Sequence, residues 1–531
     1  MARRDEGFAM MTVVMGLGAI VVLATVVFQG ALREYDGAQY QRRDDTLIAG
    51  AEAMLERYAT KLTIDPLYYL SWVDEAELPR RCTQNGSSGN GDVVQPGNAW
   101  FDDCFTWTYE PLTDYFFHPL VLGVADNPAD DVGVRMTVTP PESSEIGVGV
   151  TLVATHGEFG QSRAVQASVR AEAISEFAFL VEDDLRFGSG ANIHGKVYTG
   201  GNLDFVQTPD QGRVHRNAYA EGLIGRTAGY GPPEFVSGAV GYDSGGTYQD
   251  IRTQYPDPLD FTNFWDDLEI IRNVACYRDG LCLSATNPAL NLVQTPTAWL
   301  LRPTTSGSNA RIEVSVAYSN TTTGCLTAEE WWWLNSQNAA WTLLGTYDVP
   351  PSGVVWVEGH AVIGQPGDTS RIGSSMTIYA GSLGAPRNVI LASDIIYQSG
   401  TSGTTVLGLI ASDEIWINPY AVGGDDEMTF SAALLGQGGS LNVARDCGSS
   451  GSVILPYSGG VPVSTLHTNG AMALRDTGDV AAHFGTRNYQ FDQRLETMRP
   501  PFFPLMRETW TYQEWFEVNL PCWATAAGCG S

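Results

Sequence analysis

Lysine is nearly absent from this chain. The sequence has 30 basic residues among 531, and only Lys61 and Lys196 are lysines. Asp and Glu number 60, so the formal net charge is −30, while charged residues make up 17% of the sequence against roughly 25% in an average globular protein. A polyanion of this kind is not built to coat nucleic acid or an anionic membrane with its whole surface.

Signatures of common catalytic and metal chemistry are also missing. The sequence contains no Gly-x-Ser-x-Gly, His-Glu-x-x-His or phosphate-loop motif, and its 7 histidines are scattered. No Cys-x-x-Cys pair indicates zinc or thioredoxin-like chemistry. We therefore expect no enzyme, metal or cofactor. We expect the acidic loops 126–131 and 423–427 to be solvated turns, with calcium binding as the second hypothesis, since neither loop matches an EF-hand.

The 8 cysteines favour structural disulfides in an exported protein. The pairs that lie close in sequence are Cys82 with Cys104, Cys276 with Cys282, and Cys522 with Cys529, which leaves Cys325 and Cys447. Sequence alone does not fix connectivity, and free thiols packed in a core are the alternative.

One long apolar run is present, from Phe8 to Phe28. At 1.5 Å per residue it spans about 31 Å, enough to cross a hydrocarbon core of about 30 Å. Arg3 and Arg4 precede the run, so the positive-inside rule places the start of the chain in the cytoplasm and the body outside. A cleaved secretory signal is disfavoured because the run is longer than a usual signal core.

The helical pattern continues past the membrane segment, through residues 31–65. Apolar residues recur at helical spacing, and Pro66 ends the pattern. These residues are Leu47, Ile48, Ala51, Met54, Leu55, Tyr58 and Leu62. The spacing predicts an amphipathic helix that continues directly from the membrane segment at 8–30.

This arrangement resembles the N-terminal helix of a type IV pilin. Residues 1–7 resemble a prepilin leader, with cleavage between Gly7 and Phe8. Pilins usually carry glutamate at the fifth mature position, where this chain has Thr12. In the family, that glutamate neutralises the N-terminal amine of a neighbouring subunit. A subunit at the tip has no such neighbour above it, so Thr12 at this position resembles the pattern of minor pilins that begin a fibre. A plain signal anchor is the alternative.

Two different β patterns follow the helix. Alternation of apolar and polar residues between Val132 and Ala173 predicts a small antiparallel sheet, which places a pilin-like domain with a disulfide loop at 66–180. Residues 181–475 are glycine-rich with short apolar runs, and Leu391–Tyr397 recurs as Ile410–Trp416, nineteen residues later. A parallel β-solenoid is predicted there, with a β-sandwich as the alternative.

Residues 476–531 resemble the closing segment of large pilin-like proteins with β-solenoid heads, including ComZ-like and PilX-like minor pilins. The fold class expected is thus an α+β pilin module with a large, mostly-β domain. The sequence leaves open whether that domain is inserted into the pilin sheet or appended to it.

Two surface sites are candidates for binding. Lys196, Arg213, Arg216 and Arg226 form the least acidic stretch, where the resemblance to DNA-uptake pilins would place phosphate contacts. Dispersed surface arginines are the alternative. Trp331, Trp332 and Trp333 cannot all face one core, so they form a candidate aromatic platform for sugars or bases, with coverage by neighbouring loops equally favoured.

The function we expect is a minor pilin at or near the tip of a type IV pilus, active in assembly initiation and in adhesion or DNA capture. Expected partners are other major and minor pilins, the inner-membrane assembly machinery, and DNA or surface glycans. The rival hypothesis is a signal-anchored polysaccharide-active enzyme of the cell envelope, with Asp394 and Asp413 aligned at equivalent repeat positions.

Overall fold

The protein is described from a computed structural model, in which two compact units are distinguished. Unit 1 comprises residues 1–140, 147–170 and 510–531, and unit 2 comprises residues 141–146 and 171–509. The structure describes residues 6–64, 108–110, 115–122, 132–139, 146–156, 160–188, 192–206, 213–214, 218–222, 224–227, 234–236, 239–242, 248–251, 264–277, 280–306, 309–318, 341–381, 386–418, 427–443, 446–447, 453–454, 465–478, 484, 486–506 and 510–521.

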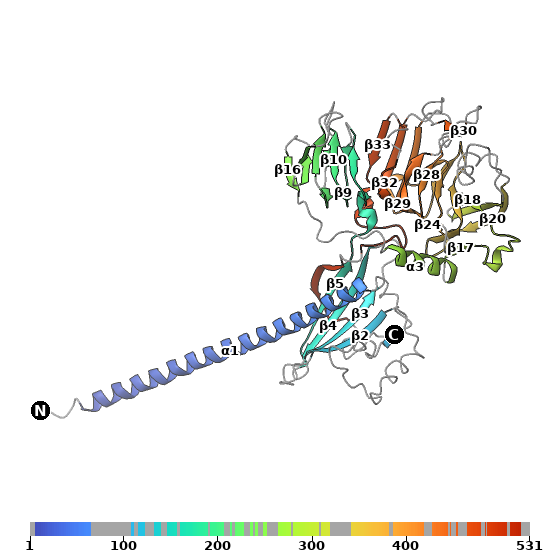
Figure 1. Ribbon diagram of the computed structural model, residues 1–531. Helices are drawn as coiled ribbons and strands as arrows, with labels where there is room; N and C mark the ends of the chain where they lie inside the picture. Colours follow the sequence, from blue (N-terminus) through green and yellow to red (C-terminus); the bar gives the residue numbers. More distant parts are fainter. Residues whose placement is uncertain are drawn as a thin grey trace, which may run out of the picture. The chain divides into compact units, whose positions relative to one another are not determined.

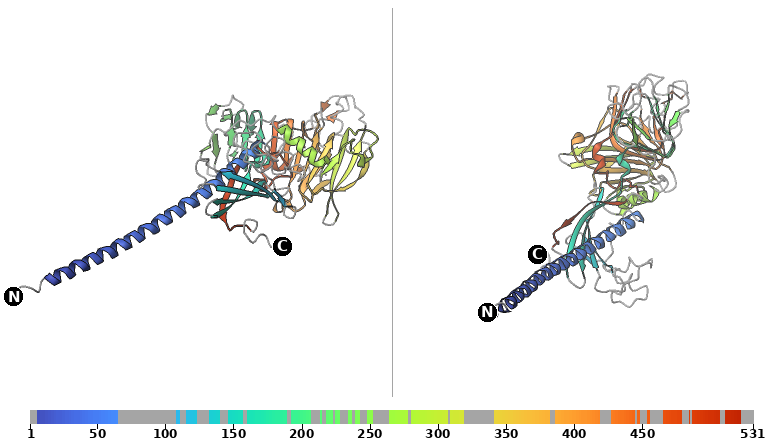
Figure 2. Two further views of the ribbon diagram at one scale, coloured as in Figure 1. Left: turned by 90° about the horizontal axis from the view of Figure 1, so that it is seen from below. Right: turned by 90° about the vertical axis from the view of Figure 1, so that its left-hand side faces the viewer.

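Helix α1 (Glu6–Ile64) is a single helix of 59 residues. Its second half lies across β3, β4 and β5 of unit 1, while its first half runs beyond the sheet (Figure 1). The apolar face predicted for residues 47–62 is buried there: Leu47, Ala51, Met54, Leu55, Tyr58 and Leu62 are each at most 2% exposed. The same arrangement is visible from two further directions in Figure 2.

The sheet of unit 1 is antiparallel, as the alternation in sequence predicted. Its strands are β1 (Thr108–Glu110), β2 (Tyr115–Leu122), β3 (Val132–Thr139), β4 (Gly147–His156), β5 (Ser162–Arg170) and β34 (Thr511–Val518), in that spatial order. In β4, Val148, Val150 and Leu152 are buried, and the residues between them are partly exposed. A long helix on an antiparallel sheet agrees with a pilin-like module.

The last strand of this sheet decides the question that the sequence left open. β34 pairs antiparallel with β5, from Thr511 opposite Arg170 to Val518 opposite Ala164. The segment that builds unit 2 therefore leaves the sheet after β5 and returns before β34. The mostly-β domain is inserted into the sheet, not appended to it.

Unit 2 contains a continuous parallel ladder. In spatial order its strands are β12 (Ala218–Ala220), β9 (Lys196–Thr199), β6 (Phe177–Val181), β32 (Thr465–Asp476), β29 (Glu427–Val443), β27 (Leu407–Ala411), β24 (Met376–Gly381), β21 (Val354–Glu358) and β17 (Leu281–Leu283). Apolar residues of neighbouring strands stack in register, as Val355, Ile378, Leu409 and Leu434 do, and all four are fully buried.

The chain enters this ladder in the middle. It runs outward through β6, β9 and β12, continues to helix α3 (Phe264–Tyr277), and re-enters at the opposite edge, β17. From β17 it returns strand by strand until β32 pairs with β6. Leu268, Ile271, Val274 and Ala275 of α3 are buried.

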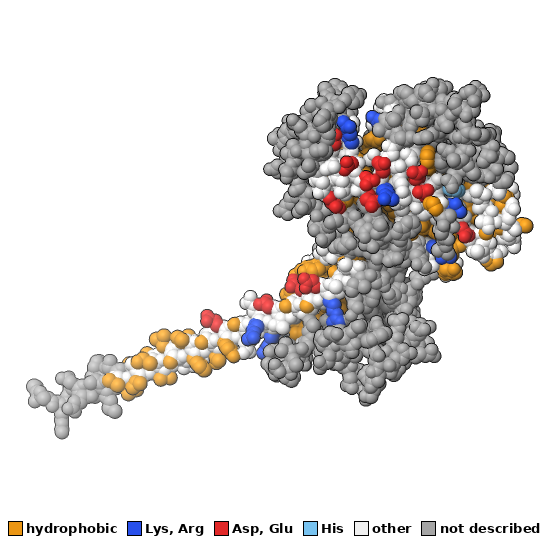
Figure 3. Space-filling view, in the orientation of Figure 1, with side chains coloured by type: hydrophobic (Ala, Val, Ile, Leu, Met, Phe, Trp, Pro, Cys, Tyr) orange, Lys and Arg blue, Asp and Glu red, His pale blue; other side chains and the backbone are white. Residues whose placement is uncertain are grey.

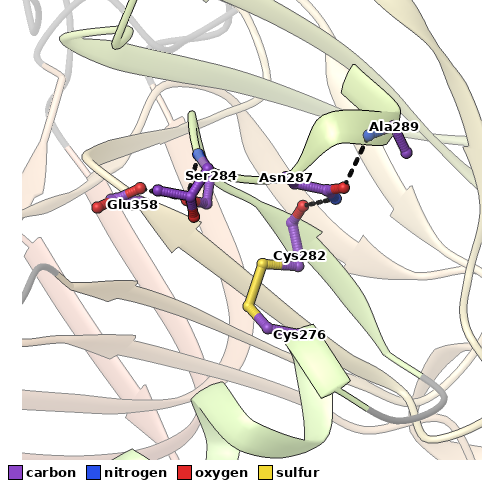
Figure 4. The surroundings of a disulfide bond; sticks show 7 residues. Cys276, Cys282, Ser284, Asn287, Ala289 and Glu358 are labelled. Atoms are coloured by element: carbon purple, nitrogen blue, oxygen red, sulfur yellow. Dashed lines mark hydrogen bonds between the residues drawn. A yellow bond between two sulfur atoms is a disulfide. The ribbon is translucent and has the colours of Figure 1, made fainter. Parts of the chain in front are cut away.

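A disulfide joins α3 to the edge strand β17 (Figure 4). Cys276 and Cys282 are bonded with an S–S distance of 2.07 Å, which matches the pairing inferred from their closeness in sequence. The side-chain amide of Asn287 donates to the carbonyl of Cys282 at 2.7 Å, and Ser284 donates to the carboxylate of Glu358 on β21. Helix, edge strand and following turn are thus tied together.

Further parallel strands flank the main ladder. They are β7 (Leu185–Phe187), β10 (Leu203–Val206) and β13 (Ile224–Thr227); β8 (Asn192–Ile193) with β11 (Arg213–Val214); β22 (His360–Ile363), β25 (Val389–Leu391) and β28 (Ile415–Ile417); and β23 (Thr369–Ile372), β26 (Asp394–Tyr397) and β33 (Thr486–Gln490).

Antiparallel pairs are present as well, so the sheets of unit 2 are mixed. β18 (Ala298–Ser306), β19 (Asn309–Ala317) and β20 (Thr342–Asp348) form an antiparallel meander, and β18 also pairs in parallel with β22. Antiparallel pairs also join β13 to β14 (Glu234–Val236), β15 (Ala239–Tyr242) to β16 (Tyr248–Ile251), and β30 (Asp446–Cys447) to β31 (Val453–Ile454).

The nineteen-residue repeat expected from the sequence is not the register of these ladders. Ile378 pairs with Leu409 and Leu409 pairs with Leu434, steps of 31 and 25 residues. Asp394 begins β26, opposite Thr369, whereas Asp413 lies between β27 and β28. Asp394 and Asp413 are therefore not equivalent positions, because the similar heptapeptides belong to different sides of successive turns.

Truncation of the helix face that packs on the sheet should destabilise unit 1. Leu55 is fully buried and Leu23, on the same helix, is 64% exposed. We expect Leu55→Ala to lower the free energy of unfolding by about 2–5 kcal/mol, because it leaves a cavity. Leu23→Ala is the matched control and should have little effect. Denaturant titration of the detergent-solubilised chain measures both, and equal effects would contradict this packing.

A buried histidine should make unit 2 sensitive to acid. His360 is 3% exposed, and its Nδ1 accepts a hydrogen bond from the backbone N–H of Asn388 at 3.1 Å. Burial, followed by the charge of Arg387, lowers the pKa of His360 from 6.5 to about 4. The unfolded chain therefore binds a proton more readily than the folded chain between these two values, and stability must fall as pH falls through this window.

The free energy of unfolding should fall by about 3 kcal/mol at most, and this loss should be absent above pH 6.5. His360→Asn keeps an acceptor near the Nδ1 position without the titrating ring. We expect the variant to show a smaller decrease of melting temperature between pH 6.5 and pH 4 than the parent chain. An unchanged pH dependence would show that His360 is not held neutral.

Candidate assembly helix and surface sites

The first half of α1 is an uncovered apolar surface. Its large side chains are well exposed: Met11, Val13, Val14, Met15, Leu17, Ile20, Val21, Val22, Leu23, Val26, Val27 and Phe28 are each 57–65% exposed. On the face drawn in Figure 3, hydrophobic side chains are spread along this segment of the helix. Among the described residues, α1 is the one helix long and apolar enough to span a membrane, with a mean hydropathy of 2.2 in its best window.

Polar contacts begin where the helix reaches its sheet. The Asp44 carboxylate accepts hydrogen bonds from the side-chain amide of Gln161 at 2.5 Å and from Arg163 at 2.7 Å. The bond to Asp44 raises the pKa of the Arg163 guanidinium further above its ordinary value. These contacts fix the axial position and rotation of α1 next to β5. One helix therefore has two parts, one docked on its own sheet and one without any cover.

The contact of Asp44 with Gln161 and Arg163 has no signature in the sequence. Asp44 lies 119 residues from Arg163 in the chain, and no local pattern joins them. Asp44 lies just before the buried helix face, but several other charged residues lie there too, so this position alone does not single it out.

The predicted processing residues all lie on the helix backbone. α1 begins at Glu6, so Gly7, Phe8 and Thr12 are helical, and Thr12 falls within the apolar segment. Their side chains are outside the described residues. Cleavage after Gly7 and the role of Thr12 stay predictions.

Lys196 is engaged by two carboxylates of unit 2. Its ammonium donates to Glu172 Oε1 at 2.8 Å, lies 3.4 Å from Glu176 Oε2, and is 5.6 Å from the centre of the Phe177 ring. Partial burial alone would lower the pKa of Lys196, but the bonds and charges of Glu172 and Glu176 outweigh it, so the pKa is raised. Its charge is thus neutralised within the unit.

The other members of the predicted basic stretch are not brought into one described cluster. Arg213 lies on β11 opposite Asn192, and Arg226 lies on β13 between Phe205 and Glu234. The side chains of both, and Arg216 entirely, lie outside the described residues. So do Trp331, Trp332 and Trp333, the loops 126–131 and 423–426, and Cys82, Cys104, Cys325, Cys522 and Cys529.

The two aspartates considered for sugar chemistry have separate surroundings. Asp394 Oδ1 accepts the backbone N–H of Thr429 at 2.8 Å, which ties β26 to β29. At Asp413 the backbone carbonyl accepts from Gly438 and the N–H donates to Arg387, which organises the turn between β27 and β28. Both aspartates therefore support strand turns of the ladder.

No family model and no curated protein matches the chain. Among solved structures, the chain is similar to the competence-associated pilin ComZ from Thermus thermophilus. The sequence identity is 14% and the TM-score is 0.25, over 88% of this chain and 96% of that chain. A likeness at this level carries no argument about function.

The engagement of Lys196 changes what a DNA-binding experiment should show. We expect Lys196→Ala to leave the salt dependence of binding to duplex DNA unchanged, because two carboxylates already neutralise this lysine. Combined alanine substitution of Arg213, Arg216 and Arg226 should reduce the slope of log K against log salt by roughly three units if they contact phosphates.

The measurement is fluorescence anisotropy of the full chain in detergent with labelled duplex DNA across a salt series. Equal slopes in the arginine variant and the parent would reject this stretch as the phosphate site. Absence of binding at low salt would reject a direct DNA role.

Proposed function

We propose that this chain is a minor pilin of a type IV pilus, displayed at or near the fibre tip, where it helps to initiate assembly and acts in adhesion or DNA capture. One observation carries the proposal. A single helix is buried against its own sheet over residues 47–62 and is fully uncovered over its apolar first half. A soluble protein does not expose such a surface in water.

An uncovered apolar helix needs a partner of the same character. Before assembly that partner is the membrane, because the segment matches the thickness of its hydrocarbon core. After assembly it is the bundle formed by the helices of other major and minor pilins, delivered by the inner-membrane machinery. The body then lies outside the cell, first on the cytoplasmic membrane and later on the fibre.

The position at the tip rests on two features. Thr12 stands where other pilins carry the glutamate that pairs with a neighbouring subunit, so this chain lacks that contact. Unit 2 also spans residues 171–509, and a body of this size in every subunit would crowd a helical fibre. Both features favour a subunit that is added once and displayed at an end.

We also propose that unit 2 is a β-solenoid, supported by the parallel register from β17 through β32 to β12, with the antiparallel meander β18–β20 as a local elaboration. We propose a role without catalysis, because the carboxylate of Asp394 holds the backbone of Thr429 and Asp413 lies in the turn between β27 and β28, so the two do not form one site. A solenoid offers long flat faces for ligands.

The N-terminus of the mature protein tests the pilin assignment. We expect mass spectrometry of the protein purified from its native cells to find Phe8 as the first residue, with an N-methylated amine. A variant with Gly7→Glu should retain the leader and be absent from sheared fibres. The matched control is Gly30→Glu, which adds the same charge to α1 away from the cleavage site and should be cleaved normally. An intact start at Met1 or Ala2 would support an ordinary anchor.

Immunogold labelling tests the position within the fibre. We expect gold particles at fibre ends. An even distribution along the fibres would refute the tip assignment while leaving the pilin assignment intact.

A further inference from the structure

Three adjacent parallel strands of unit 2 carry polar side chains in register. One row is formed by Glu427, Thr465 and Thr486 on β29, β32 and β33, and the next row by Thr429, His467 and Asn488. We call these six side chains the polar face. Neighbouring positions are about 4.8 Å apart across the strands and about 6.6 Å apart along them.

Burial shows that these side chains point away from the core. Met428, Phe430 and Leu466, which alternate with them, are at most 1% exposed, whereas Glu427, Thr486 and Asn488 are exposed and the other three are partly exposed. Asn469 and Gln490 continue the same pattern two residues farther along β32 and β33. The face therefore forms a regular grid on the outside of the ladder.

Contacts within the grid hold its side chains in place. The amide nitrogen of Asn488 lies 3.2 Å from His467 Nδ1, and His467 Nε2 lies 3.4 Å from Glu427 Oε2. Beside them, Asp394 fixes the backbone of Thr429. An amide that donates to Nδ1 leaves the Nε2 proton directed at Glu427, so one arrangement satisfies both contacts. The side chains are thereby preorganised before any ligand arrives.

The chemistry of this face selects among ligand classes. It has no arginine or lysine and one carboxylate, Glu427, with Asp394 at its border, so it does not attract a polyanion such as DNA. It also has no aromatic or aliphatic side chain, whereas the centre of a protein interface is usually apolar. Hydroxyl, amide, imidazole and carboxylate groups both donate and accept, which suits a ligand rich in hydroxyl groups.

We propose that the polar face of β29, β32 and β33 binds a neutral polysaccharide, whose hydroxyl groups pair with the regularly spaced side chains. The proposal deepens the proposed function, because it names the ligand class for adhesion by a displayed subunit. Binding at each contact is weak, but a polymer can occupy several grid positions at once, and the regular spacing therefore strengthens the overall binding.

The test is native affinity electrophoresis of the full chain in detergent, through gels that contain dextran, hydroxyethyl cellulose or yeast mannan. Alginate and duplex DNA are the anionic comparisons. The test variant is His467→Ala with Asn488→Ala. The matched control is Thr342→Ala with Thr346→Ala, which removes two exposed polar side chains from β20 of the same unit. Melting temperatures of both variants establish that the fold is retained.

We expect at least one neutral polysaccharide to retard the parent chain and the control, with a dissociation constant raised roughly tenfold or more in the test variant. Retardation by none of the three, equal retardation of the test variant, or loss in the test variant of binding to alginate or DNA alone would each overturn the proposal. Failure here leaves the processed N-terminus and fibre position unchanged, so it is distinguishable from failure of the pilin assignment.

Discussion

The pairing of β32 with β6 is the contact on which the continuity of unit 2 depends. Met472, Ala473 and Leu474 align in parallel with Phe179, Leu180 and Val181, which lie far earlier in the chain. Without this pairing, both strands would present unpaired backbone groups and apolar side chains at an open edge. Because the two strands lie far apart in the chain, the pairing has a large closure entropy, which is offset by the burial that it completes.

The segment that follows β33 stabilises the ladder from its outer side. Arg494 donates to the carbonyls of Gly403 and Thr405, pairs with Asp492, and lies 4.7 Å from the centre of the Tyr397 ring. Farther on, Thr377 of β24 donates to the carbonyl of Pro501 at 2.5 Å. A Cβ on Gly408 would lie 2.7 Å from Phe503, so glycine at this position lets the segment pack closely on β27. The segment thus crosses successive strands and restricts their separation.

Local patterns predicted the elements better than their connections. The spacing of Leu47 to Leu62 was sufficient for the buried helix face, and alternation was sufficient for β3 to β5, because both reflect burial on one side of a single element. The return of β34 to β5 left no local signal, since an edge strand of this sheet and a strand of the inserted domain have the same alternation. The repeat at Asp394 and Asp413 was misleading because the two similar heptapeptides cover different strands: Leu391–Tyr397 runs from β25 into β26, whereas Ile410–Trp416 runs from β27 into β28.

The candidate sites show the same division. Lys196 was found by its rarity, but its neutralisation by Glu172 and Glu176 depends on the turn that brings β9 next to residues 172–176, which residue counting does not show. The polar face was not found because Glu427, His467 and Asn488 are unremarkable singly. They become a grid only through the register of three strands, and register is a property of the ladder rather than of any one segment.

Insertion of unit 2 between β5 and β34 separates two physical requirements that act on this chain. Within unit 1, the burial of residues 47–62 and the contact of Asp44 with Arg163 hold the helix on its sheet and leave its apolar first half uncovered. The inserted ladder can lengthen by adding strands, because each new strand needs only the edge of the preceding one. A surface of the ladder such as the polar face can therefore grow or change without altering the helix and the sheet of unit 1.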